Sequence, residues 1–85
     1  MEIYKDLKEI AKELDEIKKE TKYVKASIDE TEEGDEWDIN ITAYNFLERV
    51  IYDTTYATYT VRSDATDALL AITDAYPGFD ANFGK

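Results

Sequence analysis

The chain has 85 residues, of which twenty are Asp or Glu and ten are Lys or Arg, and its formal net charge is −10. This length predicts one domain with a modest hydrophobic core, spanning residues 1–85. Cysteine and histidine are both absent, which excludes disulfide bonds, thiol chemistry, and the commonest general base and transition-metal ligand.

The negative charge is unevenly distributed. Residues 1–25 carry seven basic and seven acidic residues, whereas residues 26–85 carry thirteen acidic residues against Arg49, Arg62 and Lys85. Such a surface repels nucleic acid and anionic lipid and attracts basic proteins; alternatively, the acids only keep the protein in solution. No apolar run approaches the roughly 18–20 residues that span a bilayer, and the charged N-terminus has no signal-peptide core. We therefore expect a cytoplasmic protein that contacts neither membranes nor nucleic acid directly.

Residues 2–19 are predicted to form an amphipathic helix, because apolar residues recur along one stripe at helical spacing. These residues are Ile3, Leu7, Ile10, Leu14 and Ile17. The stripe favours packing of the helix on the protein's own sheet. Its spacing also fits a short coiled-coil seam, so a homodimer through this first helix is the alternative.

Two segments, 22–29 and 37–44, alternate between apolar and polar residues as half-buried strands do. In the first, Val24 and Ile28 share one side; in the second, Ile39 and Ile41 do. The connection between them is acidic and contains Gly34, which suits a turn. We expect an antiparallel hairpin with an acidic tip.

The C-terminal half is harder to assign. Residues 45–53 fit either a short helix or part of a strand, and residues 54–62 have a strand composition, so we expect one principal strand at about 55–62. Ser63 and Asp64 predict the N-cap of a helix over 65–76, which ends before Pro77. In the tail, Phe79 and Phe83 either dock on the core or belong to a frayed end.

Together these elements predict the order α-β-β-β-α. The fold class is α+β, with a small antiparallel sheet of three or four strands flanked by two helices. Placing both helices on one face of the sheet is the simplest way to bury their apolar stripes.

The densest cluster of charge lies at residues 29–38. Its seven carboxylates belong to Asp29, Glu30, Glu32, Glu33, Asp35, Glu36 and Asp38. Alternate side chains of an extended chain lie about 6.6–7 Å apart, so Glu30, Glu32, Glu36 and Asp38 would form a row of anions at roughly phosphate-like spacing. Such a row would pair with Lys and Arg side chains that normally hold phosphates. A solvated hairpin loop is the alternative.

Aromatic side chains are the second candidate for partner binding. We expect Trp37 and Tyr44 to add apolar contacts beside the acidic segment. We further expect Tyr23, Tyr44 and Tyr52 on the sheet face opposite Val24, joined by one tyrosine of residues 54–62. Such a patch suits protein binding, and the alternative is that these rings form the rim of the core.

Catalysis and cofactor binding have no support in the sequence. Counted from Asp29, Gly34 occupies the position of the EF-hand glycine, but the twelfth position is Asn40 instead of the bidentate Glu, and strands flank the segment. No phosphate-binding loop, nucleophile elbow or dinucleotide fingerprint occurs. We expect a protein that is not an enzyme and has no metal or other cofactor.

In size, charge and element order the chain resembles the small acidic phage-encoded inhibitors that mimic DNA. These include anti-CRISPR proteins that block Cas effectors, one Cas9-directed family of which has the same α-β-β-β-α order, and inhibitors of uracil-DNA glycosylase. The resemblance implies an inhibitor in the host cytoplasm, with residues 29–38 as its binding segment. Double-stranded-RNA-binding domains share the order but need a basic last helix, whereas residues 64–76 contain no Lys or Arg.

Two functional hypotheses follow. In the first, the protein is an acidic decoy that binds the basic groove of a nucleic-acid-binding protein, a Cas effector above all, and blocks DNA or RNA binding. In the second, it is a non-catalytic interaction or oligomerisation module whose acidity serves only solubility.

Overall fold

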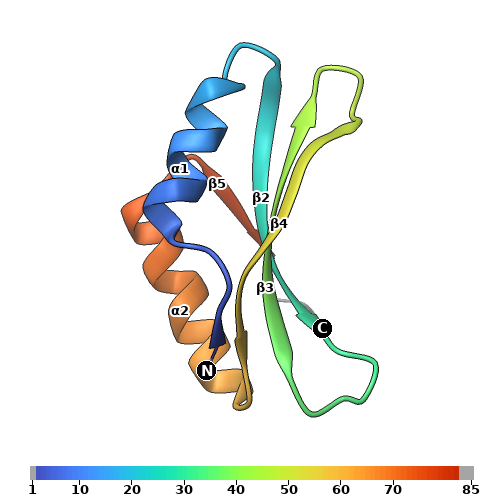
Figure 1. The fold of residues 1–85 in the computed structure, drawn as a ribbon, viewed down its shortest axis with the longest axis vertical. Helices are drawn as coiled ribbons and strands as arrows, with labels where there is room; N and C mark the ends of the chain where they lie inside the picture. Colours follow the sequence, from blue (N-terminus) through green and yellow to red (C-terminus); the bar gives the residue numbers. More distant parts are fainter. Residues whose placement is uncertain (1, 83–85) are drawn as a thin grey trace.

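The computed structural model describes residues 2–82, which form two helices and a five-stranded sheet (Figure 1). In chain order the elements are β1 (Glu2–Ile3), α1 (Leu7–Glu16), β2 (Thr21–Glu30), β3 (Trp37–Asn45), β4 (Val50–Tyr59), α2 (Arg62–Ala75) and β5 (Phe79–Asn82). The strand order is β1-β4-β3-β2-β5. All neighbours pair antiparallel except β2 and β5, which are parallel. Both helices lie on one side of the sheet (Figure 1), so the α+β class is confirmed.

The predicted hairpin is confirmed, because β2 and β3 pair antiparallel with Asp29 opposite Asp38. The third strand was predicted too late: β4 begins at Val50 and ends at Tyr59. Its register against β3 skips Ile51 and Tyr56, which are bulges. A bulge shifts the alternation of side chains by one residue, and this explains why residues 45–53 did not read as a strand.

The first helix is shorter than predicted, because Glu2 and Ile3 form strand β1 on the edge of β4. The Asp6 side chain caps α1 by accepting a hydrogen bond from the Lys8 amide at 2.9 Å. The helix therefore begins after Asp6, where a carboxylate satisfies a free N–H group and complements the helix dipole.

The second helix begins earlier than predicted, and its N-cap was assigned wrongly. Val61 is the N-cap residue and makes no side-chain capping bond. Only two residues separate the end of β4 from α2, so the position of the helix follows from the strand before it. The buried side chains of Ala65, Leu69 and Ile72 then fix which face meets the sheet.

The sheet has five strands where three or four were predicted, because both chain ends contribute one. The tail forms β5 beside β2. Phe79 packs against the core, which confirms for this residue the alternative in which the tail docks on the core. Phe83 lies outside the described residues.

The core fills the space between the helices and one face of the sheet. Its largest fully buried side chains are Ile10 of α1, Ile39 and Ile41 of β3, and Leu69 of α2. On α1, Leu14 is also buried, and Leu7 and Ile17 pack against the core. The apolar stripe of the first helix is therefore used within the chain, and the seam that a coiled-coil dimer needs is occupied.

A polar contact ties α1 to the sheet. Glu13 Oε1 accepts a hydrogen bond from the Tyr52 hydroxyl at 2.7 Å and forms an ion pair with Lys5. These contacts lower the pKa of Glu13, with the hydrogen bond from Lys5 as the larger cause. Burial, and then the bond to the Glu13 carboxylate, raise the pKa of Tyr52 well above its ordinary value.

The raised pKa of Tyr52 predicts a loss of stability at alkaline pH. A tyrosine in the unfolded chain deprotonates near about pH 10, whereas folded Tyr52 keeps its proton there. Unfolding then releases a proton, so the free energy of unfolding falls as pH rises above about 10. In Tyr52→Phe this decline should be less steep, though still present because burial also raises the pKa of Tyr23 and Tyr59. Denaturant unfolding at several pH values tests this; equal slopes in variant and wild type would contradict it.

The loop between β3 and β4 is braced by one side chain. Asn45 Oδ1 accepts hydrogen bonds from the amides of Leu47 and Arg49, both at 2.9 Å. The Asn45 amide in turn donates to the Arg49 carbonyl at 2.9 Å, and Glu48 adopts a left-handed φ of 59°. An Asn side chain favours such turns because it satisfies amides that the tight loop leaves free.

Replacing Asn45 by Ala should therefore destabilise the protein by about 1–2 kcal/mol, since two net hydrogen bonds are lost. Asn45→Asp keeps the acceptor oxygen and should cost less. Thermal unfolding of both variants measures the difference. Equal melting temperatures for Asn45→Ala and wild type would show that the brace contributes nothing.

Among residues 2–82, neither helix is long and apolar enough to cross a membrane.

Candidate functional site

The acidic hairpin, defined as residues 29–38, forms one end of the molecule at the bottom of Figure 1. Its loop is closed by hydrogen bonds from the Thr31 amide to the Glu36 carbonyl (3.0 Å) and from the Gly34 amide to the Thr31 carbonyl (2.9 Å). Gly34 has a φ of +74°, a conformation that favours glycine. The loop thus forms a defined turn, which fixes the backbone positions from which its acidic side chains extend.

Most of the predicted binding carboxylates are accessible. The exposed ones are Asp29, Glu30, Glu32, Glu33 and Asp35, and Glu36 and Asp38 are half-buried. Residues 26–48 contain eight acidic residues and no Lys or Arg. The start of α2, with the exposed acid Asp64 in its first turn, lies at the same end of the molecule (Figure 1). The structure therefore gathers the acidic segment at one end of the molecule, where Arg62 at the start of α2 is also exposed. The predicted row of Glu30, Glu32, Glu36 and Asp38 is wrong, because a turn separates the strands and Glu30, opposite Trp37, lies on the other face of the sheet from Asp38.

Two of these acids face each other on the open face of the sheet, which is the face without helices. Asp29 and Asp38 are direct partners across β2 and β3, an arrangement in which like charges repel. Hydrogen-bond donors on neighbouring side chains compensate the negative charge of each carboxylate. Asp29 Oδ2 accepts from Asn40 Nδ2 at 2.6 Å and from the Ser27 hydroxyl at 3.1 Å, and Asp38 Oδ1 accepts from the Thr58 hydroxyl at 2.5 Å.

The polar network continues across the open face. The Thr55 hydroxyl donates to Asn40 Oδ1 at 2.7 Å, and the Thr42 hydroxyl donates to Asp53 Oδ1 at 3.2 Å. A shallow trough of about 580 Å³ follows these residues. It is lined by Lys25, Ser27, Asp29, Asn40, Thr42, Tyr44, Asp53, Thr54 and Thr55. These short polar side chains orient the acids and leave room for a long side chain from outside.

Neither predicted aromatic anchor lies beside the carboxylates of Asp29 and Asp38 on the open face. Trp37 is half-buried and packs against the core on the helix side. Tyr44 lies on the open face but seven residues further along β3, about 23 Å from Trp37 at strand spacing. There it stacks on Tyr23, with ring centroids 4.7 Å apart. Period-two alternation assigns a residue to a face, whereas distance along the strand decides which residues meet.

The predicted tyrosine patch is correspondingly smaller. Tyr23 and Tyr44 form its only pair within the described residues. Tyr52 points to α1 and bonds Glu13, Tyr56 packs against the core, and Tyr59 is buried. The bulges at Ile51 and Tyr56 reverse the expected facing of this strand.

Sequence reasoning missed the polar residues that support the acids, namely Ser27, Asn40, Thr55 and Thr58. The signal was present in part, because Asn40 and Thr42 alternate in phase with Asp38. Their partners on β2 and β4 follow only from strand register, which the bulges of β4 hide.

No group of three or more side chains suited to hold a metal ion occurs in the part of the chain that the structure describes. A comparison of the chain with models of protein families, with curated proteins and with solved structures finds no match.

Proposed function

We propose that the protein is an acidic decoy that binds the basic nucleic-acid groove of a defence nuclease, a Cas effector above all, and excludes DNA or RNA from it. The observation that supports this most is the acidic hairpin, in which a closed loop and two opposed strand carboxylates form one negative end without a single basic residue between positions 26 and 48. Solubility alone does not require crowding that costs electrostatic repulsion.

The supporting hydrogen bonds also suit an incoming cation. Both bonds to Asp29 end at Oδ2, and the bond to Asp38 ends at Oδ1. Each carboxylate thus has a second oxygen to which a guanidinium or ammonium group can donate. The guanidinium group of arginine donates hydrogen bonds to carboxylate oxygens in the same way as it does to phosphate oxygens. The trough beside Asp29 accommodates the stem of such a side chain.

In this proposal the protein acts in the cytoplasm and has no catalytic role. The exposed carboxylates of Glu30, at the end of β2, and of Glu32, Glu33 and Asp35 in the loop supply long-range attraction. Asp29 and Asp38 supply oriented contacts. Electrostatic steering of this kind raises the association rate and decreases with added salt.

The proposal is tested by competition. A fluorescent DNA or guide-RNA duplex is bound to a candidate nuclease, and the acidic protein is added at several salt concentrations. We expect displacement of the nucleic acid, with an apparent affinity that falls steeply as salt rises. Displacement that does not depend on salt, or a ternary complex in which the duplex stays bound, would contradict the decoy mechanism.

A further inference from the structure

An apolar tip projects from the end of the molecule opposite the acidic hairpin, at the top of Figure 1. It comprises Phe46 and Leu47 in the β3–β4 loop and Val50 at the start of β4, with exposed fractions of 67%, 74% and 55%. The Asn45 brace holds the loop in one turn, so these side chains are preorganised. A rigid apolar projection of this kind is typical of an interface.

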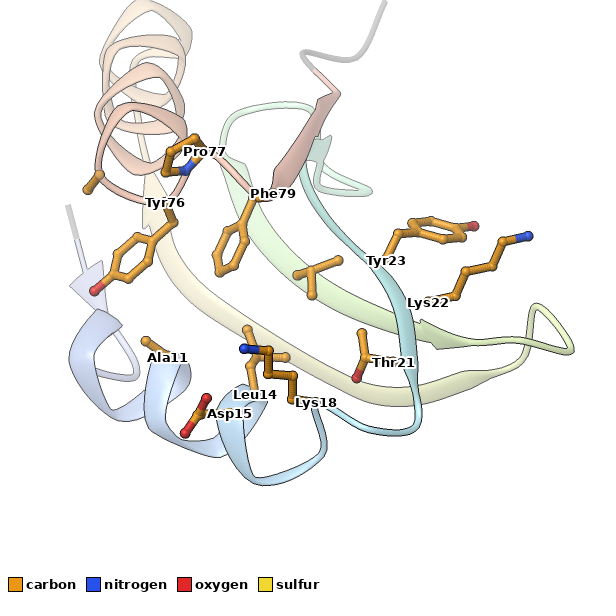
Figure 2. Close-up of a pocket in the computed structure, with 13 residues that line it drawn as sticks. Ala11, Leu14, Asp15, Lys18, Thr21, Lys22, Tyr23, Tyr76, Pro77 and Phe79 are labelled. Carbon is orange, nitrogen blue, oxygen red and sulfur yellow. The ribbon is translucent and has the colours of Figure 1, made fainter.

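An apolar groove of about 510 Å³ lies beside this tip, between α1 and the segment that joins α2 to β5 (Figure 2). Leu14, Val24 and Phe79 are among its lining residues, and the Phe79 ring stacks on Tyr76 with centroids 5.3 Å apart. Figure 2 shows Leu14 and Phe79 facing the same space. The volume lies in the range of about 300–1,000 Å³ that holds a drug-sized ligand, so it accommodates two large side chains.

The tip and the groove are neighbours on one surface. Lys22 lines the groove, and its Nζ lies 3.0 Å from Glu48 Oε1 in the tip loop. Tyr23, which also lines the groove, stacks on Tyr44 one residue before the braced loop. A projection and a recess side by side form a patch that can be self-complementary, as an interface about a two-fold axis between two copies must be.

We propose that two copies of this chain form a closed dimer in which the apolar tip of each fills the apolar groove of the other. The charges beside the two features match. Lys18 and Asp15 line the groove and form no ion pair within residues 2–82, whereas Glu48 and Arg49 flank the tip. Glu48 already pairs with Lys22 of its own chain, so the complementary contact between the copies is that of Arg49 of one copy with Asp15 of the other.

The net charge of −10 does not oppose this contact strongly, because the acidic hairpin lies at the far end. The end that holds the tip and the groove carries a small net charge, with four basic and four acidic residues in the last turn of α1, the turn after it, the start of β2 and the β3–β4 loop, and with Asp74 and Asp80 beside the groove. The first eight are Lys18, Lys19, Lys22 and Arg49 with Asp15, Glu16, Glu20 and Glu48. Both acidic hairpins of the dimer remain free for a basic partner.

Sedimentation velocity from low to high micromolar concentration tests the dimer. Wild type is expected to dimerise, and the tip variant F46D/L47D should weaken the dimer by about 30-fold or more, because truncating buried anchors has effects of this size. Leu70→Asp is the matched control, since Leu70 is exposed on α2 away from both features. Circular dichroism checks that each variant is folded.

A mixing experiment distinguishes this dimer from binding of the apolar tip to anything other than the groove of a second copy. Ala75→Trp fills the groove from an exposed position at the end of α2, and alone it should block dimerisation as the tip variant does. Mixed together, the two variants restore one tip-in-groove contact, so a heterodimer should form where neither variant dimerises alone. A monomeric wild type, a dimer unaffected by F46D/L47D, or the absence of the heterodimer would each overturn the proposal. So would a monomer that binds phosphatidylglycerol vesicles through Phe46 and Leu47.

Discussion

If the protein is an acidic decoy as proposed, the quadruple variant E30Q/E32Q/E33Q/D35N is expected to lose inhibition of the nuclease while remaining folded. All four side chains are exposed, so their replacement removes no core contact. Each charge-assisted hydrogen bond to a cationic partner contributes about 1.5–3 kcal/mol, and the loss of several should weaken binding by about 100-fold or more. Competition against labelled DNA measures this. The melting temperature should stay equal or rise, because the variant relieves repulsion among neighbouring carboxylates.

A second quadruple variant controls for net charge. E9Q/E16Q/E20Q/D74N also changes the charge from −10 to −6, but its exposed positions lie on α1, the turn after it and α2. If the acidic hairpin binds the partner, this control keeps most of the inhibition. Equal loss in both variants would mean that only overall charge matters, and full inhibition by the hairpin variant would exclude the hairpin as the binding site.

The largest expected effect on stability comes from Leu69→Ala. Leu69 is fully buried between α2 and the sheet, and such truncations cost about 2–5 kcal/mol, depending on how far the cavity collapses. A domain of this size has a free energy of unfolding of roughly 5–15 kcal/mol, so the variant should lose a large fraction of it. Denaturant unfolding gives the value directly.

The adjacent residue provides the control. Leu70 has the same side chain on the same helix but is 51% exposed, so Leu70→Ala should change the free energy of unfolding by less than about 0.5 kcal/mol. Similar losses in both variants would place α2 in a different rotation on the sheet from the one described.

Elements with an unbroken pattern were predictable from the sequence. The β2–β3 hairpin followed from alternation about Val24 and Ile39, and the inward face of α1 followed from the spacing of Ile10 and Leu14. These patterns suffice to predict an element because each one depends only on the buried face of a single regular helix or strand.

Elements that depend on distant partners were not predictable. Strand β1 is only two residues long and exists through its pairing with Ala57 and Thr58. Strand β4 was obscured by its two bulges. The start of α2 was set by the short connection from β4, which overrode the capping preference of Ser63 and Asp64.

The candidate site was predictable as a segment but not as a surface. Local charge density identified residues 29–38, whereas the supporting donors on Ser27, Asn40 and Thr58 come from three strands and depend on register. Tyr44 shows the converse error: its alternation was right, but the length of β3 separates it from the acids.

Hydrogen–deuterium exchange of the protein, free and bound to a nuclease that it displaces from DNA in the competition test, tests the proposed function most directly, because it locates the contact without altering any residue. We expect the bound state to slow exchange at the loop amides of residues 32–36, apart from that of Gly34, which is already hydrogen-bonded, and at the adjoining ends of β2 and β3. Unchanged exchange there, with new protection confined to the helices or to the β3–β4 loop, would show that the nuclease binds another surface.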